Sequence, residues 1–130
     1  VKSNVIDKFP FSSDSNATDV GDLSTTKSNM SGQSSSASGY ISGGQIPSDT
    51  NVIEKFSFSS DGNVTDVGDL IEVNASSAGQ SSTASGYVSG GDSSGTVRNI
   101  IQKFSFSSDA NATDVGNLTL SRRDACGQQY

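Results

Sequence analysis

The sequence predicts an all-β fold of short strands grouped into β-propeller blades, and three observations support this prediction. One stretch occurs three times, at residues 5–23, 52–70 and 100–118, and its copies repeat every 47 or 48 residues. Each repeat holds three or four short apolar segments separated by turn-forming residues, which is typical of a blade rather than of a solenoid coil of ~20–30 residues. No segment combines an apolar stripe of helical period with helix caps, so no helix is expected.

The repeats divide the chain into residues 1–50, residues 51–98 and a truncated third unit at residues 99–130. Each unit is too small to bury a core alone, so neighbouring units must pack together. Val, Ile, Leu and Phe number 27, close to the ~20% below which disorder is expected, and serine contributes 28 residues. Against the alternative of a disordered linker stands the regular placement of three phenylalanine pairs, Phe9/Phe11, Phe56/Phe58 and Phe104/Phe106.

The first element of each unit is an apolar strand, at residues 5–11 in the first copy. Phe9 and Phe11 share one parity, so both rings should lie on one face of this strand. Ile6 has the opposite parity, which requires a bulge or burial on both faces. Pro10 lacks a backbone donor and indicates an outer position in this copy.

The other elements follow in a constant order. Residues 12–16 form a turn, and residues 17–23 form a second short strand whose internal glycine indicates a bulge or a close backbone approach. A variable segment then ends in Gly-Gln. The last strand contains Tyr40-Ile41 or Tyr87-Val88 and is closed by glycine pairs, which predict tight turns with positive φ, at Gly43-Gly44 and Gly90-Gly91.

Charge and residue content disfavour several classes of function. Fourteen acidic and eight basic residues give a net charge of −6, which disfavours nucleic acid and anionic membranes as partners. No apolar run approaches the ~20 residues that span a bilayer, so membrane insertion is not expected. The chain lacks histidine and has one cysteine, Cys126, so neither a Cys-His nucleophile nor an intrachain disulfide is available. We therefore expect no enzyme, and no cofactor apart from one candidate ion.

That candidate is calcium, suggested by the acidic turn of each repeat. Oxygen-bearing side chains stand at relative positions 1, 3, 5 and 9, which is the ligand spacing of a calcium loop. The loop lacks the glycine expected at position 6 and the bidentate Glu expected at position 12. The alternative is a local turn in which Asp14 and Asn16 bond nearby backbone N–H groups. The candidate ligands are Asp14, Asn16, Thr18 and Asp22; Asp61, Asn63, Thr65 and Asp69; and Asp109, Asn111, Thr113 and Asn117.

Two further patterns suggest surface chemistry. Tyr40 and Tyr87, flanked by serine and glycine, could form a platform for stacking on a glycan, and the alternative is a contact within or between blades. Each acidic turn also contains Asn-x-Thr, an acceptor for N-glycosylation in a chain that passes through a eukaryotic secretory route, at Asn16, Asn63 and Asn111.

The order of elements resembles a kelch-type blade. In that family a strand ends in a double glycine, an aromatic-bearing strand follows, and a basic residue precedes the next double glycine. The double glycines here are Gly43-Gly44 and Gly90-Gly91, and the aromatic position holds Phe9, Phe56 or Phe104. The sequence departs from the family in two ways, since it has Asn74 at the basic position of the second copy and no tryptophan.

The amino-acid sequence of the repeats gives a more specific resemblance than the order of elements does. The forms IxKFxFSSDxNATDVGDL and GQSSxxSGYxSGG resemble repeats in virion-associated and tail proteins of marine and freshwater viruses, especially cyanophages, over residues 4–130. The ending RDACGQQY resembles the natural terminus of such proteins. The resemblance implies a component of the extracellular particle, such as a tail fibre or adhesin that mediates assembly or host attachment. The alternatives are a lectin-like propeller and a fragment of a glycan-active enzyme.

The ends of the chain predict partners. The chain starts at Val1 without methionine or a signal-peptide h-region, so we expect a segment of a longer polypeptide. The third copy stops at Tyr130 and lacks the ASGYxSGG strand of the other two copies. Fewer than three blades cannot close a ring that typically has ~4–8. Closure is expected from other copies of the chain, from upstream sequence or from another virion protein.

Overall fold

The chain folds entirely into β-strands and turns. The computed structural model describes residues 2–128, so the interpretation of the terminus at Gln129 and Tyr130 lies outside it. In this part of the chain there is no helix, and hence none long and apolar enough to cross a membrane. The all-β prediction is confirmed. The strands are β1 (Ser3–Lys8), β2 (Thr18–Lys27), β3 (Ser31–Ser34), β4 (Ser38–Ser42), β5 (Val52–Ser57), β6 (Thr65–Asp69), β7 (Ala78–Ser81), β8 (Ser85–Ser89), β9 (Asp92–Ser93), β10 (Thr96–Val97), β11 (Ile100–Ser105) and β12 (Thr113–Asn117).

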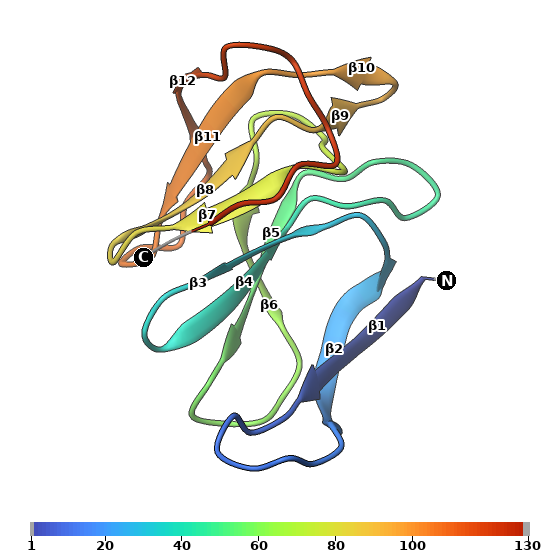
Figure 1. Cartoon of the computed structure of the whole chain (residues 1–130), viewed down its shortest axis with the longest axis vertical. Helices are drawn as coiled ribbons and strands as arrows, with labels where there is room; N and C mark the ends of the chain where they lie inside the picture. Colours follow the sequence, from blue (N-terminus) through green and yellow to red (C-terminus); the bar gives the residue numbers. More distant parts are fainter. Residues whose placement is uncertain (1, 129–130) are drawn as a thin grey trace.

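These strands form two four-stranded antiparallel sheets and two smaller ones (Figure 1). Strands β3, β4, β5 and β6 pair in that order, and β7, β8, β11 and β12 repeat the arrangement one unit later. The N-terminal hairpin, β1 paired with β2, stands as a separate two-stranded sheet. The short hairpin of β9 and β10 is inserted between β8 and β11.

Each four-stranded sheet is built across a boundary of the sequence repeats. The second half of one copy supplies β3 and β4, and the first half of the next supplies β5 and β6, with Tyr40 opposite Lys55. The glycine pair makes this possible, because Gly43 and Gly44 have φ of +64° and +103°, which few other residues adopt. The Gly43 N–H then donates to the Val52 carbonyl at 3.0 Å, which starts the pairing of β4 with β5.

The bulge predicted at the internal glycine is present in all three hairpins. The register shifts between Ile6 and Asp7 in β1, and at the equivalent step of the later copies. In the middle copy, Ile53 is opposite Gly68 and Glu54 is opposite Asp66, so Val67 is the extra residue. The extra residue lies on β6 and not on β5. Ile53 is buried on one face of β5, and Phe56, which has the opposite parity, is half-buried on the other.

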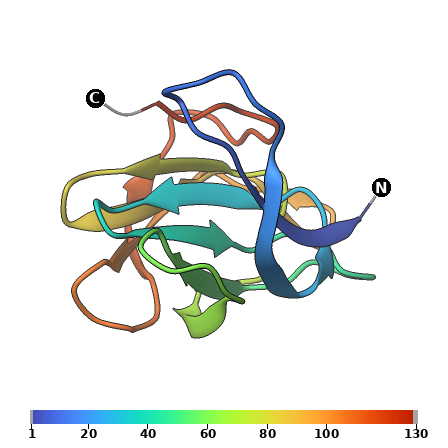
Figure 2. The same ribbon diagram turned by 90° about the horizontal axis from the view of Figure 1, so that it is seen from below.

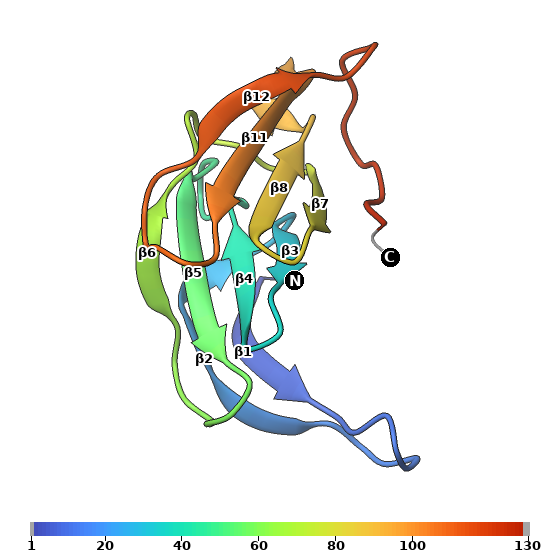
Figure 3. The ribbon, with the colours of Figure 1, turned by 90° about the vertical axis from the view of Figure 1, so that its left-hand side faces the viewer.

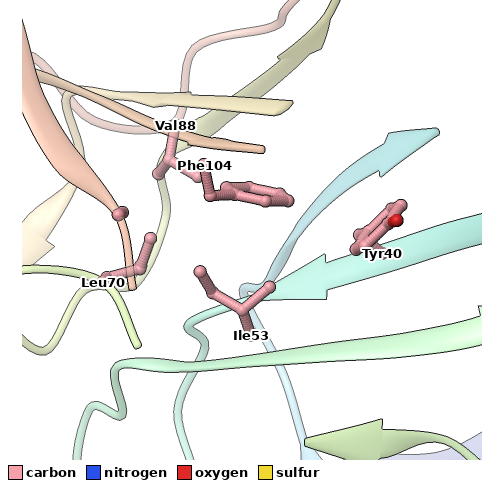
Figure 4. Close-up of a cluster of buried hydrophobic side chains, with 6 residues drawn as sticks. Tyr40, Ile53, Leu70, Val88 and Phe104 are labelled. Carbon is pink, nitrogen blue, oxygen red and sulfur yellow. The ribbon is translucent and has the colours of Figure 1, made fainter. Parts of the chain in front are cut away.

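The core lies between the two four-stranded sheets, which face each other (Figures 2 and 3). Tyr40, Ile53 and Leu70 come from the sheet of β3 to β6, and Val88 and Phe104 come from the sheet of β7, β8, β11 and β12. Figure 4 shows these side chains pointing toward one another. The tyrosine ring stacks on Phe106 with the centroids 4.7 Å apart. Within residues 2–128 the sheets do not close into a ring.

Candidate functional site

The most distinctive feature of the structure is the junction between successive repeats, which uses the same residues twice. Lys8 of the first repeat donates to the Asp61 carboxylate of the second at 3.0 Å. One repeat later, Lys55 donates to Asp109 at 3.2 Å. These pairs are largely exposed, so each adds only about 0–1 kcal/mol of stability, and their main effect is to fix the register of stacking.

An asparagine reinforces each ion pair. The backbone N–H of Asp22 donates to Asn63 Oδ1 at 3.0 Å, and that of Asp69 donates to Asn111 Oδ1 at 3.0 Å. Beside the first of these bonds, the Gly62 N–H donates to the Val20 carbonyl at 2.8 Å. The turn between β5 and β6 therefore hydrogen-bonds to β2, and the turn between β11 and β12 hydrogen-bonds to β6. We call this set of Lys–Asp and Asn–backbone contacts the clasp.

A line of glycines joins the opposite edge of the sheets. A Cβ on Gly79 would overlap the carbonyl oxygen of Gly32, and a Cβ on Gly127 would overlap that of Gly79. The three residues are the glycines of the repeated Gly-Gln pair, so the chain segments of successive repeats approach backbone to backbone at these glycines. Nothing lies within 4 Å of the position of a Cβ on Gly32, which is the first residue of this line.

This line gives a matched pair of substitutions. Gly79→Ala should destabilise the fold by about 1–3 kcal/mol, because the new methyl group meets rigid backbone. Gly32→Ala should change the free energy of unfolding by less than about 0.5 kcal/mol, since its site is open. Urea denaturation followed by circular dichroism measures both variants. Equal effects would show that the strands do not stack in this order.

A buried ion pair lies at the first junction. Lys27 Nζ donates to Glu54 Oε2 at 2.8 Å, and the two side chains are 1% and 0% exposed. The Ser24 hydroxyl and its backbone N–H both donate to Glu54 Oε1. The glutamate thus has partners for both oxygens, which a buried carboxylate requires.

The second junction has a neutral version of this pair. Asn74 stands at the position of Lys27 and Gln102 at that of Glu54, and both are fully buried. Gln102 Oε1 accepts from the Ile71 N–H at 2.7 Å, as Glu54 accepts from Ser24. Asn74 Oδ1 and Gln102 Nε2 have no hydrogen-bond partner among residues 2–128, so the neutral pair is less completely satisfied than the charged one.

The predicted calcium ligands are distributed over these contacts. Asp61 and Asp109 pair with lysines, and Asn63 and Asn111 accept from the preceding repeat. The hydroxyls of Thr18 and Thr113 donate to backbone carbonyls of their own hairpins. Among residues 2–128 no group of three or more Asp, Glu, Cys or His residues is arranged to hold a metal. Calcium binding stays a prediction; the remaining candidates are Asp14, Asn16, Asp22, Thr65, Asp69 and Asn117.

The alternative expectation of a local turn at Asp14 and Asn16 has to be corrected. In the part of the chain that the structure describes, neither side chain bonds a nearby N–H group. The equivalent side chains of the later copies bond the preceding repeat instead. Local contacts of an aspartate with a backbone N–H group occur in the strand that follows the turn. Asp19, Asp66 and Asp114 each accept from the N–H of the glycine two residues later.

The two candidate glycan contacts have different surroundings. Tyr40 is 3% exposed and lies in the core between the sheets, so its ring is not available for stacking on a sugar. The alternative role in a core contact is the one that the structure shows for it. Tyr87 is half-buried, and a glycan contact there stays a prediction. Cys126 is an exposed free thiol.

Sequence reasoning missed the clasp and the buried pair. The signal for the buried pair was present, because the positions of Lys27 and Glu54 change together to Asn74 and Gln102 in the next copy. A charged pair that becomes neutral at both equivalent positions indicates that the two positions lie in the same environment. The clasp lysine and aspartate recur in every repeat and gave no comparable signal.

Taken together, the interlocking sheets and clasps define an all-β repeat protein in which positions shared by the copies serve the junctions. In comparisons with known proteins, no family model matches the chain. No curated protein matches it at a significant level.

Proposed function

We propose that the chain is a non-enzymatic structural module of an extended repeat array, joined to further units at both ends. The observation that carries this proposal is the clasp, which is identical at the two internal junctions and is left half-made at each end. A device that repeats along the chain suits a structural task, because an active site is needed only once. Three acidic side chains of the repeats form ion pairs with lysines, namely Glu54, Asp61 and Asp109.

The two ends are complementary in charge. Lys103 is the equivalent of Lys8 and Lys55, and it has no ion-pair partner among residues 2–128. Asp14, the equivalent of Asp61, is likewise unpaired in that range. Arg122 occupies the position of Lys27, and Asp7 occupies that of Glu54; both are exposed. A positive C-terminal end and a negative N-terminal end favour end-on association in the register of the internal junctions.

The array is proposed to belong to a virion surface or tail, as a tail fibre or adhesin module that mediates assembly or attachment to a host. This part of the proposal rests on the resemblance of the repeats to viral ones. Its partners are further copies or other virion proteins. A kelch-like ring is the finer proposal for the fold, supported by the two four-stranded meanders that pack face to face, and further sheets would have to close it.

The lectin alternative is weakened by the burial of Tyr40, which leaves Tyr87 as its single aromatic candidate. A glycan array separates the two proposals. We expect no binding above background for the isolated chain. Saturable binding that is lost in Tyr87→Ala would favour attachment through a carbohydrate.

End-on association is tested by reversing the charges of the clasp. The wild-type chain should show a sedimenting mass that rises with concentration, whereas Lys103→Asp and Asp14→Lys should each associate more weakly, because like charges then meet at the junction. An equimolar mixture of the two variants should associate again, since each offers the partner that the other needs. Analytical ultracentrifugation measures all three cases. The proposal would be contradicted if the wild-type chain is monomeric at every concentration. It would also be contradicted if the mixture associates no more strongly than each variant alone.

A further inference from the structure

An aromatic cavity of about 360 Å³ lies between the N-terminal hairpin and the hairpin of β5 and β6. Its apolar lining consists of four phenylalanines with Ile6 and Val20: Phe9, Phe11, Phe56 and Phe58. Phe58 is 47% exposed, and Phe9 is 57% exposed. Aromatic surface of this extent at a cavity wall is a feature of binding sites.

The equivalent place one repeat later is filled. There Phe104 and Phe106 stand where Phe56 and Phe58 stand at the cavity, and Tyr40 packs against both. The ring centroid of Tyr40 is 5.5 Å from that of Phe104 and 4.7 Å from that of Phe106. Tyr40 belongs to β4, which pairs with β5. A strand that paired with β1 in the same way would therefore place its own tyrosine in the cavity.

Strand β1 has a free edge where that strand would lie. In the described structure β5 pairs with β4 and β6, and β11 pairs with β8 and β12, whereas β1 pairs with β2 alone. Figure 1 shows the N-terminal hairpin outside the two four-stranded sheets. An unpaired strand edge is a template for the backbone of another strand.

The phenylalanine of each first strand also indicates which residue should face it. Phe56 is opposite Gly39, and Phe104 is opposite Gly86. A Cβ on either glycine would overlap the facing ring, so no larger residue fits there. The Phe104 ring lies against Gly86 and is only 3% exposed, whereas Phe9 has no facing strand and is exposed. The next residue of the added strand, on the opposite face, would then be the tyrosine.

We propose that the free edge of β1 and the aromatic cavity together bind one β-strand of the sequence Ser-Gly-Tyr-aliphatic-Ser, supplied by a further repeat of this same kind. The strand adds to β1 by backbone pairing, its glycine lies under Phe9, and its tyrosine enters the cavity against Phe58. The inference rests on the proposed function, because it names what the N-terminal end of the module receives from a neighbouring unit. That unit has to be a repeat with the complete hairpin, as in residues 1–50 or 51–98, rather than one like residues 99–130.

The open position beside Gly32 agrees with this occupant. In the described chain each later glycine of the Gly-Gln line rests on the carbonyl of the one before it, and Gly32 has no such neighbour. A complete hairpin equivalent to β3 and β4 would bring both the tyrosine strand to β1 and a glycine carbonyl to Gly32. The free edge and the open position therefore fit the same type of segment, a hairpin like residues 31–42.

The test uses the full chain, at concentrations where it sediments as a monomer, and a synthetic peptide with the sequence of residues 31–44. Titration calorimetry should give saturable one-to-one binding, and the melting temperature of the chain should rise with peptide concentration. Matched peptides with Gly39→Val or Tyr40→Ser should bind at least about tenfold more weakly, the first through overlap with Phe9 and the second through the empty cavity. The chain variant Phe58→Ala should weaken binding of the unmodified peptide.

Three results would overturn the inference: no binding at millimolar peptide, equal binding of the Gly39→Val peptide, or unchanged binding to Phe58→Ala. The outcomes remain separate from those of the charge-reversal experiment. If copies associate end to end but the peptide does not bind, the module is structural and the cavity has another role. If the peptide binds but copies do not associate, the strand-binding site at β1 is supported and end-on association through the clasp is contradicted.

Discussion

Glu54→Ala should be among the most damaging single substitutions in the chain, with an expected loss of about 3–5 kcal/mol in the free energy of unfolding. The variant leaves the Lys27 ammonium buried without its carboxylate and leaves the Ser24 N–H without an acceptor. Urea denaturation followed by circular dichroism measures the loss. A change below about 1 kcal/mol would mean that this pair is hydrated in solution.

The chain supplies its own control for this substitution. The double variant Lys27→Asn with Glu54→Gln copies the second junction, where Asn74 and Gln102 occupy the same positions. No charge is then buried, and the introduced glutamine side chain can still accept from the Ser24 N–H. The double variant should therefore regain at least about half of the stability lost in Glu54→Ala. If the double variant is less stable than Glu54→Ala, removing the charge does not by itself make this buried site stable. The pair of Asn74 and Gln102 would then depend on its own surroundings.

Phe104→Ala should cost about 3–5 kcal/mol, because the ring is buried between the sheets and touches Tyr40. Phe9→Ala, at the equivalent position of the first repeat, should cost less than about 1 kcal/mol, because that ring is largely exposed. The same denaturation experiment measures both variants. Similar losses for both would show that the first hairpin is packed like the third, which the arrangement of the sheets does not allow.

The fold class and most elements could be predicted from the sequence, because the repeat fixes where each pattern begins. The strand with Phe9, the turn after it and the glycine bulge at Gly21 follow from local chemistry. What could not be predicted is which strands share a sheet. The sequence repeat starts at Asn4, Asn51 and Asn99, whereas each complete sheet starts in the middle of a copy, at β3 or β7.

The candidate site shows the same limit. The sequence marks Asp14, Asn16 and their equivalents as polar turn residues with oxygen ligands at calcium spacing. Spacing along one loop, however, carries no information about the neighbouring repeat, and their partners Lys8 and the Asp22 N–H belong to that neighbour. Tyr40 was ambiguous for a similar reason, since a tyrosine between glycines looks the same whether it faces solvent or the phenylalanines of the next sheet.

Hydrogen exchange on the intact chain tests most directly whether sheets form across the repeat boundaries. The equivalent residues 5–8 of β1, 52–55 of β5 and 100–103 of β11 read VIDK, VIEK and IIQK, so the intrinsic exchange rates of their amides are similar. Since β5 and β11 are paired on both sides and β1 on one side, the amides of residues 52–55 and 100–103 should exchange much more slowly than those of residues 5–8. Equal protection of all three strands would contradict this architecture.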